Sequence, residues 1–462
     1  MPQDAKSIRE NRIKDKLYKI FEAFGLDLYI LAKKNTNSVK KIKRLIFLKD
    51  VFIIAFSAYG GPNMHLALYQ KRLVEEKKYL TTEQLMEYFS LCQMLPGPSS
   101  TQTLMSIGYQ FGGRVLAFLT LLVWVLPAFI LLTIAAIFIG AFQDQALGYL
   151  RFVQPVAVGF VIVAGIKMVK KTVKNRQGYL LATMAFVVTA LLRYPLDTWV
   201  NMKTPWMFPI VLVTAGLFSF FDFKGTVQKY KPIKIKFPWR SLVTFVVIFI
   251  LAGVLGKVSS NPLVILFENC YRFGTIVFGG GNVLIPMMLE QFTNHIPNGA
   301  SEPFMSTGEF LNGVGLVQAI PGPIFTIASF TGATAMKGYG VMAQVAGGFV
   351  STLGIFLPGA LLIFFVYPIW SKIKSHPIVV KALPGVIAAS SGLVLAAAYL
   401  MLLPVGFNWV TPGDYFYTNL DMVAPVNIVQ IAIIAVCSVL LFKTKIKSPW
   451  YIIVAILCGV LF

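Results

Sequence analysis

The sequence predicts an all-α polytopic membrane protein with two inverted-topology repeats and re-entrant helical hairpins. Of its 462 residues, 56% are hydrophobic and 13% are charged, whereas soluble domains carry about 25% charged residues. Apolar runs such as 115–140 and 341–370 are long enough to cross the ~30 Å hydrocarbon core as helices. The tripeptide Pro-Gly-Pro interrupts apolar sequence at 96–98 and again at 321–323, which indicates an internal repeat. Because the apolar runs are continuous, an outer-membrane barrel is excluded.

Residues 1–44 are predicted to form a basic arm on the cytoplasmic side. This stretch is polar and lacks the apolar core of a cleavable signal peptide. Lys and Arg outnumber Asp and Glu by 41 to 19 in the whole chain. Most of the excess lies in the arm and in short loops, which is typical of cytoplasmic segments. We therefore expect a multi-pass protein of the cytoplasmic (inner) membrane, with its N-terminus in the cytoplasm and no nucleic-acid partner.

The first predicted repeat, residues 45–221, contains two breaks. The run Tyr-Gly-Gly-Pro-Asn at 59–63 interrupts the first apolar segment, and four basic residues follow it within 71–78. Exporting these residues would oppose the positive-inside rule, so we expect a hairpin that enters and leaves on the cytoplasmic face. A second hairpin, 89–111, turns at the first Pro-Gly-Pro, because neither proline nor glycine continues a helix well. The full spans predicted in this repeat are 115–140, 152–172, 178–193 and 205–221.

A basic linker with one linker span, together 222–262, inverts the second predicted repeat, residues 263–462. This repeat has a break at 278–282 (Phe-Gly-Gly-Gly-Asn), a loop at 291–306 without Lys or Arg, and the second Pro-Gly-Pro hairpin. The loop is expected outside the cell. The remaining full spans are 241–257, 341–370, 378–403, 427–442 and 449–462, which gives nine spans and four hairpins. Counting every apolar segment as a span gives 13 crossings and the same inversion, and the sequence leaves open which description holds.

The motifs at these breaks resemble those of a known family. The run GGPNMHL at 60–66 and QMLPGP at 93–98 look like the N-terminal signature of the chromate ion transporters, and FGGGN at 278–282 and QAIPGP at 318–323 resemble that family's second domain. The likeness covers about 45–400, and the chain length matches the long, two-domain members. The resemblance implies a transporter that expels chromate, with sulfate as a structural analogue. Tyr59, where phenylalanine is common, and the basic arm depart from the family pattern.

Each Pro-Gly-Pro ends one half-helix and starts another, whose N-terminus points into the protein. Such an N-terminus offers unpaired N–H groups and about half a positive charge, which suits a tetrahedral dianion. The glycines allow close approach of backbone to ligand and hairpin, and the inverted repeat is expected to bring all four breaks to one point. Simple kinks for close helix packing are the alternative. The predicted substrate-binding residues are Gly60, Gly61, Pro62, Asn63, His65, Gln93, Pro96, Gly97, Pro98, Ser99, Ser100, Thr101, Gly280, Gly281, Asn282, Gln318, Pro321, Gly322, Pro323 and Thr326.

Five ionisable side chains at or near these breaks each have two interpretations. His65 could carry a coupling proton or be a structural histidine. Lys71, Arg72, Arg114 and Lys337, at the hairpin ends, could attract an anion into the cavity or serve topology and lipid contact. The histidines and cysteines have neither metal nor disulfide spacing, and the chain has no Walker loop or catalytic constellation. We therefore expect no metal, no cofactor and no enzymatic activity.

The function expected from these observations is secondary transport of chromate, or of a similar divalent oxyanion, with efflux that confers chromate resistance. One alternative is a sulfate or other anion transporter of the same fold. Another is a membrane-embedded lipid-handling enzyme or scramblase. The expected partners are the oxyanion and membrane lipids. The natural substrate, the direction, the coupling ion (a proton is one candidate) and the oligomeric state (a homodimer is one candidate) are left open.

Overall fold

The computed structural model describes residues 36–59, 62–142, 148–191, 207–221, 237–278, 281–370, 377–407, 427–444 and 446–461. The chain divides into two compact units, Met1–Val51 and Phe52–Phe462, and the second contains most of both predicted repeats. Regular structure in the described ranges is helical, without strands, which confirms the all-α class. The predicted arm up to residue 35, the basic linker at 222–236 and the predicted external stretch 408–426 lie outside the described residues.

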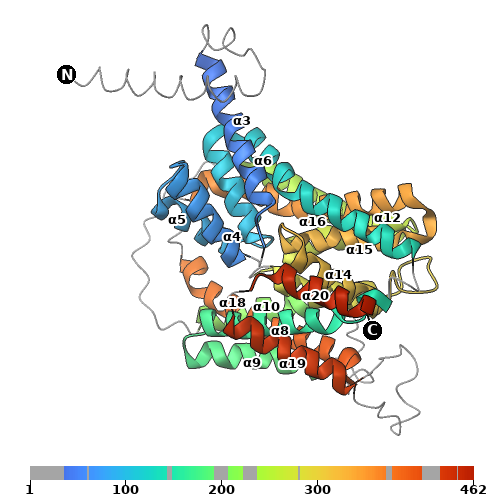
Figure 1. Cartoon of the computed structure of the whole chain (residues 1–462). Helices are drawn as coiled ribbons and strands as arrows, with labels where there is room; N and C mark the ends of the chain where they lie inside the picture. The colour runs from blue at the N-terminus through green and yellow to red at the C-terminus, as the bar shows by residue number, and fades with distance from the viewer. Residues whose placement is uncertain are drawn as a thin grey trace. The chain divides into compact units, whose positions relative to one another are not determined.

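The helices follow the chain in the order drawn in Figure 1. The first half contains α3 (Thr36–Ala55), α4 (Pro62–Tyr69), η1 (Gln70–Glu76), α5 (Thr82–Met94), α6 (Ser99–Ala141), α8 (Val153–Thr172), α9 (Arg176–Leu191), α10 (Met207–Phe221) and α11 (Trp239–Val258). The second half contains α12 (Pro262–Ile276), α13 (Gly281–Thr293), α14 (Thr307–Ala319), η2 (Ile324–Thr326), α15 (Ile327–Ala335), η3 (Lys337–Tyr339), α16 (Val341–Val366), η4 (Tyr367–Ile369), α18 (Pro377–Phe407), α19 (Ile428–Lys443) and α20 (Ser448–Leu461).

The first Pro-Gly-Pro lies at the tip of a helical hairpin made of α5 and the first part of α6. A capping box at Thr81 starts α5, because its side chain satisfies a free N–H of the first turn. The return arm ends at Gly112 and Gly113, which leave helical geometry inside α6. The ring of Tyr79, just before α5, packs edge-on against Phe111, with ring centroids 5.5 Å apart. The chain therefore returns to the end at which it entered.

The second Pro-Gly-Pro lies at the tip of a matching hairpin made of α14, η2 and α15. A capping box at Ser306 starts α14. Beyond α15 the chain turns at Gly340 (φ +88°), as it turns at Gly113 (φ +68°) in the first half. An ion pair between Lys337 Nζ and Glu309 Oε1, 2.6 Å long, joins the two ends of this hairpin. Both hairpins are therefore closed at their open ends by side-chain contacts.

The arms of these hairpins are too short to cross a bilayer. Helices α5 and α14 have 13 residues each, which corresponds to about 20 Å at ~1.5 Å per residue. The hydrocarbon core is about 30 Å thick. These lengths favour the predicted re-entrant path over a separate crossing by each arm.

Five described helices are long and apolar enough to cross a membrane, and they confirm the polytopic membrane class. They are contained in 99–141, 148–170, 239–258, 341–369 and 384–407, and they overlap five of the nine predicted spans. The other four predicted spans correspond to α9, α10, α19 and α20. These have 16, 15, 16 and 14 residues, fewer than the ~20 that a span needs. Their crossing of the membrane stays a prediction.

The helices of the second unit pack around two long members. Helix α16 contacts α6, α11, α12 and α15, whereas α18 contacts α8, α9, α10 and α13. Between α15 and α16, a Cβ on Gly332 would overlap the carbonyl oxygen of Gly347, so the two backbones touch only because glycine stands there. Helix α11 exposes large apolar side chains, including Val243, Ile250 and Val254. Such a surface suits contact with lipid tails.

Candidate functional site

One main-chain hydrogen bond joins each Pro-Gly-Pro turn to the other half of the chain. The N–H of Gly97 donates to the carbonyl oxygen of Val277 at 2.7 Å, and the N–H of Gly322 donates to that of Ala58 at 2.8 Å. Ala58 and Val277 occupy equivalent positions in the two halves, because each stands two residues before the first glycine of a glycine-rich break. The two bonds are therefore reciprocal, and each turn is fixed to the entrance of the opposite break.

Backbone geometry and packing both require glycine at these two turns. The φ angles are +108° at Gly97 and +141° at Gly322, values that other residues rarely adopt. A Cβ on Gly97 would lie 3.2 Å from Nε2 of Gln102, and a Cβ on Gly322 would lie 2.6 Å from Cβ of Ala128. Since their N–H groups already have acceptors, Gly97 and Gly322 shape the site, and donors for a ligand must come from elsewhere.

A small pocket lies between the two turns, with room for about one water molecule. Four elements that each begin close to the pocket line it, namely α4, α6, α13 and η2. Six of the predicted substrate-binding residues meet there. The described lining residues are His65, Pro98, Ser99, Ser100, Gly281, Pro323, Ile324 and Phe325.

The starts of these helices make the pocket electropositive. The first N–H groups of a helix have no acceptor within it. In α6 the N–H of Gln102 is the first to bond back, to the carbonyl oxygen of Pro98 at 2.9 Å. The N–H groups of Ser99, Ser100 and Thr101 precede it. Each helix start carries about half a positive charge. Because the described lining residues include neither Lys nor Arg, an anion would be held there by N–H groups and dipoles.

His65 is buried in the wall of this pocket, where Ser100 and the backbone of Ala58 interact with its ring. Its Nδ1 lies 3.0 Å from Oγ of Ser100, and its ring stands edge-on to Trp124, with centroids 5.2 Å apart. Trp124 in turn donates from Nε1 to Oγ1 of Thr101 at 3.1 Å, and the hydroxyl of Tyr69 donates to the carbonyl oxygen of Ser100 at 3.3 Å. Nε2 of His65 has no hydrogen-bond partner among the described residues, so this nitrogen is available to a ligand.

Gln102 supports the first Pro-Gly-Pro turn, and it was not among the predicted site residues. This buried side chain donates from Nε2 to the carbonyl oxygen of Pro96 at 2.8 Å. The same nitrogen reaches the carbonyl oxygen of Gly359 in α16 at 3.5 Å. Gln102 therefore ties the Pro-Gly-Pro turn to a helix of the other half. The available signal was an amide side chain one turn into the helix that Pro98 starts.

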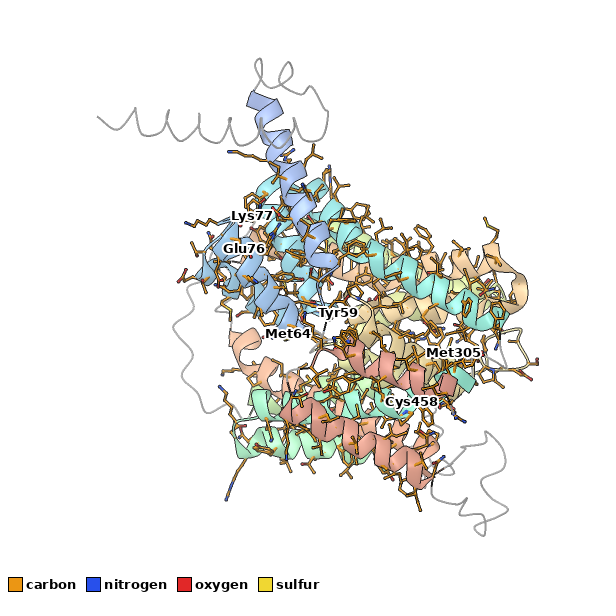
Figure 2. The ribbon with its side chains drawn as sticks, in the orientation of Figure 1. Tyr59, Met64, Glu76, Lys77, Met305 and Cys458 are labelled. Atoms are coloured by element: carbon orange, nitrogen blue, oxygen red, sulfur yellow. The ribbon has the colours of Figure 1, made fainter. Side chains whose placement is uncertain are left out.

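Several predicted site residues lie outside the pocket lining. Gln318 is buried and Gln93 is half-buried, but neither lines the pocket. The hydroxyl of Thr326 donates to the carbonyl oxygen of Pro323 at 2.6 Å, so it caps its own turn. Figure 2 labels Tyr59 and Met64, the residues on either side of the first glycine break. Outside the described residues are Gly60, Gly61 and Gly280, together with the side chains of Pro62, Asn63 and Asn282.

The four basic residues predicted to attract anions also lie away from the pocket lining. Lys71 and Arg114 are exposed. Arg72 pairs with Glu76 at 2.8 Å, and Lys337 forms the ion pair that closes the second hairpin. Their role in anion attraction therefore concerns the approach to the site and stays a prediction.

A buried charged cluster between α12 and α13 was not predicted. Arg272 is 8% exposed, and its Nε donates to Oε1 of Glu268 at 2.6 Å. Its Nη2 donates to Oδ1 of Asn269 at 2.5 Å and approaches Oε1 of Gln291 at 3.4 Å. The pair is satisfied within the protein, as a buried charge must be. The signal was the spacing of Glu268 and Arg272, four residues apart in an apolar run.

Comparison with known proteins places this architecture in a family. The family model described as "Chromate transporter" matches residues 45–220 and 264–460. A chromate transport protein of Pseudomonas aeruginosa is 22% identical over 341 residues, which cover 73% of this chain and 76% of that protein. An uncharacterized transporter of Methanocaldococcus jannaschii is 23% identical over 82% of this chain and 88% of its own length. A chromate transport protein of Cupriavidus metallidurans is 22% identical over 74% of this chain and 79% of its own length. No solved structure matches the chain.

Proposed function

Because this chain belongs to the chromate transporter family, we propose that it is a secondary transporter that moves chromate, or a similar divalent oxyanion, across the cytoplasmic membrane. The family is one of transporters and not of enzymes. The observation that carries the proposal is the pocket between the two Pro-Gly-Pro turns, at which α6 and α13 begin.

The charge of this pocket suits a divalent anion. The starts of α6 and α13, at about half a positive charge each, supply about one positive charge, which offsets part of the charge of a dianion. Ser99 and Ser100 line the pocket and add hydroxyl donors to the N–H groups. A tetrahedral oxyanion offers several acceptor oxygens to these donors. Since sulfate and chromate share this geometry, the site is expected to bind both.

Transport is proposed to follow the inverted-repeat scheme. The first arms of the two hairpins, α5 and α14, have 13 residues each and start at capping boxes, and reciprocal bonds join each tip to the opposite break. This correspondence supports a pseudo-twofold relation between the halves, with the site near the middle of the membrane. Rocking of one half against the other would expose the pocket to each side in turn.

The proposed direction is efflux, and the distribution of charge supports it. The chain carries a net charge of +22, and its basic residues are concentrated in the segments predicted to be cytoplasmic. A positive surface raises the local concentration of anions, so the site is expected to load from the inside. In inverted membrane vesicles, efflux would appear as uptake of chromate. Uptake only by right-side-out vesicles would contradict this direction.

Ligand-dependent stability of the detergent-purified protein tests the proposal. A ligand bound only by the folded state raises the apparent stability by mass action. We expect chromate and sulfate each to raise the midpoint of thermal unfolding at concentrations where chloride of equal ionic strength has no effect. A protein that responds to neither oxyanion, or equally to chloride, would contradict the proposed substrate class.

A further inference from the structure

We propose that His65 is the proton-coupling residue of this pocket, which takes up one proton when the divalent oxyanion binds and releases it when the anion leaves. This inference rests on the function proposed above and adds the coupling ion to it. Its basis is the combination of a buried anion pocket, the lack of a fixed cation in the described lining, and one ring nitrogen without a partner.

The electrostatics of the pocket call for a group that can become positive. Helix starts provide partial charges, but moving a dianion out of water still costs several kcal/mol per ion when the charge is incompletely paired. Among the described residues that line the pocket, His65 is the one ionisable side chain. An imidazolium beside the anion would make the net charge of the occupied site less negative by one unit.

The surroundings of His65 allow both charge states. Without a ligand, an isolated buried charge is unfavourable, which favours the neutral imidazole. Ser100 can then donate its hydroxyl proton to Nδ1, at 3.0 Å. When the oxyanion binds, a protonated Nε2 can donate to it, while Ser100 turns its hydroxyl to accept from Nδ1. The rotation of one hydroxyl proton accommodates both states.

No fixed charge in the described surroundings substitutes for this proton. From α4 itself the neighbouring ionisable group is the hydroxyl of Tyr69, which is engaged with the carbonyl oxygen of Ser100. Helix α6 contributes Ser100 and Trp124, and the described lining contributed by α13 and η2 is not ionisable. The ion pairs of Arg272 and Lys337 involve residues outside the lining.

The two halves of the chain differ at the position of His65, and this difference sets the number of protons taken up with each anion. His65 stands two residues after Asn63 in the first break, and the corresponding place after Asn282 in the second break is Leu284. Only one half therefore supplies an ionisable side chain here. One proton enters from the solution with each anion and binds to Nδ1, the nitrogen that carries no proton while Ser100 donates to it, and it leaves to the other side after the anion departs. No bond within the anion breaks, and the transported pair carries one negative charge.

Sulfate binding with proton counting tests this inference. Sulfate stays a dianion at neutral pH, so any proton taken up must come to rest on the protein. The heat of binding is measured by calorimetry in two buffers with different ionisation enthalpies, since their difference gives the number of protons taken up. We expect about one proton per sulfate for the unmodified protein and none for His65→Gln, whose amide can still donate to the anion. His65→Asn serves as a second variant if His65→Gln does not fold.

His295→Gln is the matched control, because His295 lies in the loop after α13. His295 is exposed, desolvation and the nearby Arg272 lower its pKa, and it does not line the pocket, so its replacement should leave the proton count unchanged. Sulfate binding without proton uptake would overturn this inference and leave the proposed function intact. Uptake that persists in both His65 variants would also overturn it. Failure of both chromate and sulfate to bind at any pH would overturn the proposed function and this inference together.

Discussion

Replacing the turn glycines by alanine tests whether the two Pro-Gly-Pro tips are held as the structure indicates. Gly97 and Gly322 both have positive φ angles, +108° and +141°, and forcing a residue with a Cβ into such a conformation costs about 1–3 kcal/mol. The surroundings of the two positions differ. The new Cβ of Gly97→Ala would meet the movable amide of Gln102 at 3.2 Å, whereas that of Gly322→Ala would meet Cβ of Ala128 at 2.6 Å.

These contacts predict an order of effects. Gly97→Ala should lower the free energy of unfolding by about 1–3 kcal/mol, because the amide of Gln102 can shift by a few tenths of an ångström. In Gly322→Ala, Ala128 has no flexible side chain to move away, so overpacking of about 1–3 kcal/mol adds to the strain and the total becomes about 2–6 kcal/mol.

Chemical unfolding in detergent, together with sulfate affinity, measures both effects. Gly338→Ala is the control, since a Cβ there meets nothing within 4 Å and its φ is not in the positive range; its free energy of unfolding should stay near that of the unmodified chain. If the three variants have the same free energy of unfolding, or if Gly97→Ala lowers it most, the described geometry of the two Pro-Gly-Pro tips is refuted.

Three further predictions concern topology, ligand donors and hairpin closure. Impermeant maleimide applied to intact cells should label a cysteine at Asn298 but not one at Lys77, because only the loop around Asn298 is expected outside; Figure 2 labels Lys77. Ser99→Ala should weaken sulfate binding, measured by calorimetry, by a hydrogen bond to a charged group, about 1.5–3 kcal/mol. Lys337→Gln should lower the free energy of unfolding more than Glu309→Gln, because it leaves a carboxylate that is 5% exposed without its cation.

Each of these measurements has a control and a contrary outcome. Cys92, Cys270 and Cys437 are buried and Cys458 is partly exposed, so a background without native cysteines mainly removes labelling at Cys458. Labelling at Lys77 from outside would exclude the re-entrant path. Ser301→Ala, in the predicted external loop, should leave sulfate affinity unchanged, and an equal loss in both serine variants would exclude a specific donor. A larger loss in Glu309→Gln would contradict the described burial of the carboxylate.

The sequence was sufficient for features that depend on local chemistry. Continuous apolar runs predicted the polytopic helical class, and the quoted motifs predicted the family. Both predictions are confirmed. Pro98 and Pro323 could be located as helix starts because proline fits the first turn and breaks the preceding one. Six of the predicted site residues then meet in one pocket, while their role as a binding site stays a prediction.

Other features depend on contacts between distant segments and could not be predicted. The reciprocal bonds of Gly97 and Gly322 connect residues of opposite halves, and no local pattern shows which carbonyl oxygen will receive an N–H group. Gln102 matters because it reaches Gly359 in α16, which only the packing reveals. The helices α9, α10, α19 and α20 have 16, 15, 16 and 14 residues, close to the lengths of the spans predicted there, and their crossing of the membrane stays a prediction.

The position of bound chromate tests the central claim most directly. A structure of the purified protein in the presence of chromate, with chromium located by its anomalous scattering, would show where the anion lies. We expect one strong peak between the start of α6 at Ser99 and the start of η2 at Ile324, within reach of Nε2 of His65. A peak beside Arg272, or at no ordered position under conditions in which chromate raises the unfolding temperature, would contradict a binding site made of helix starts.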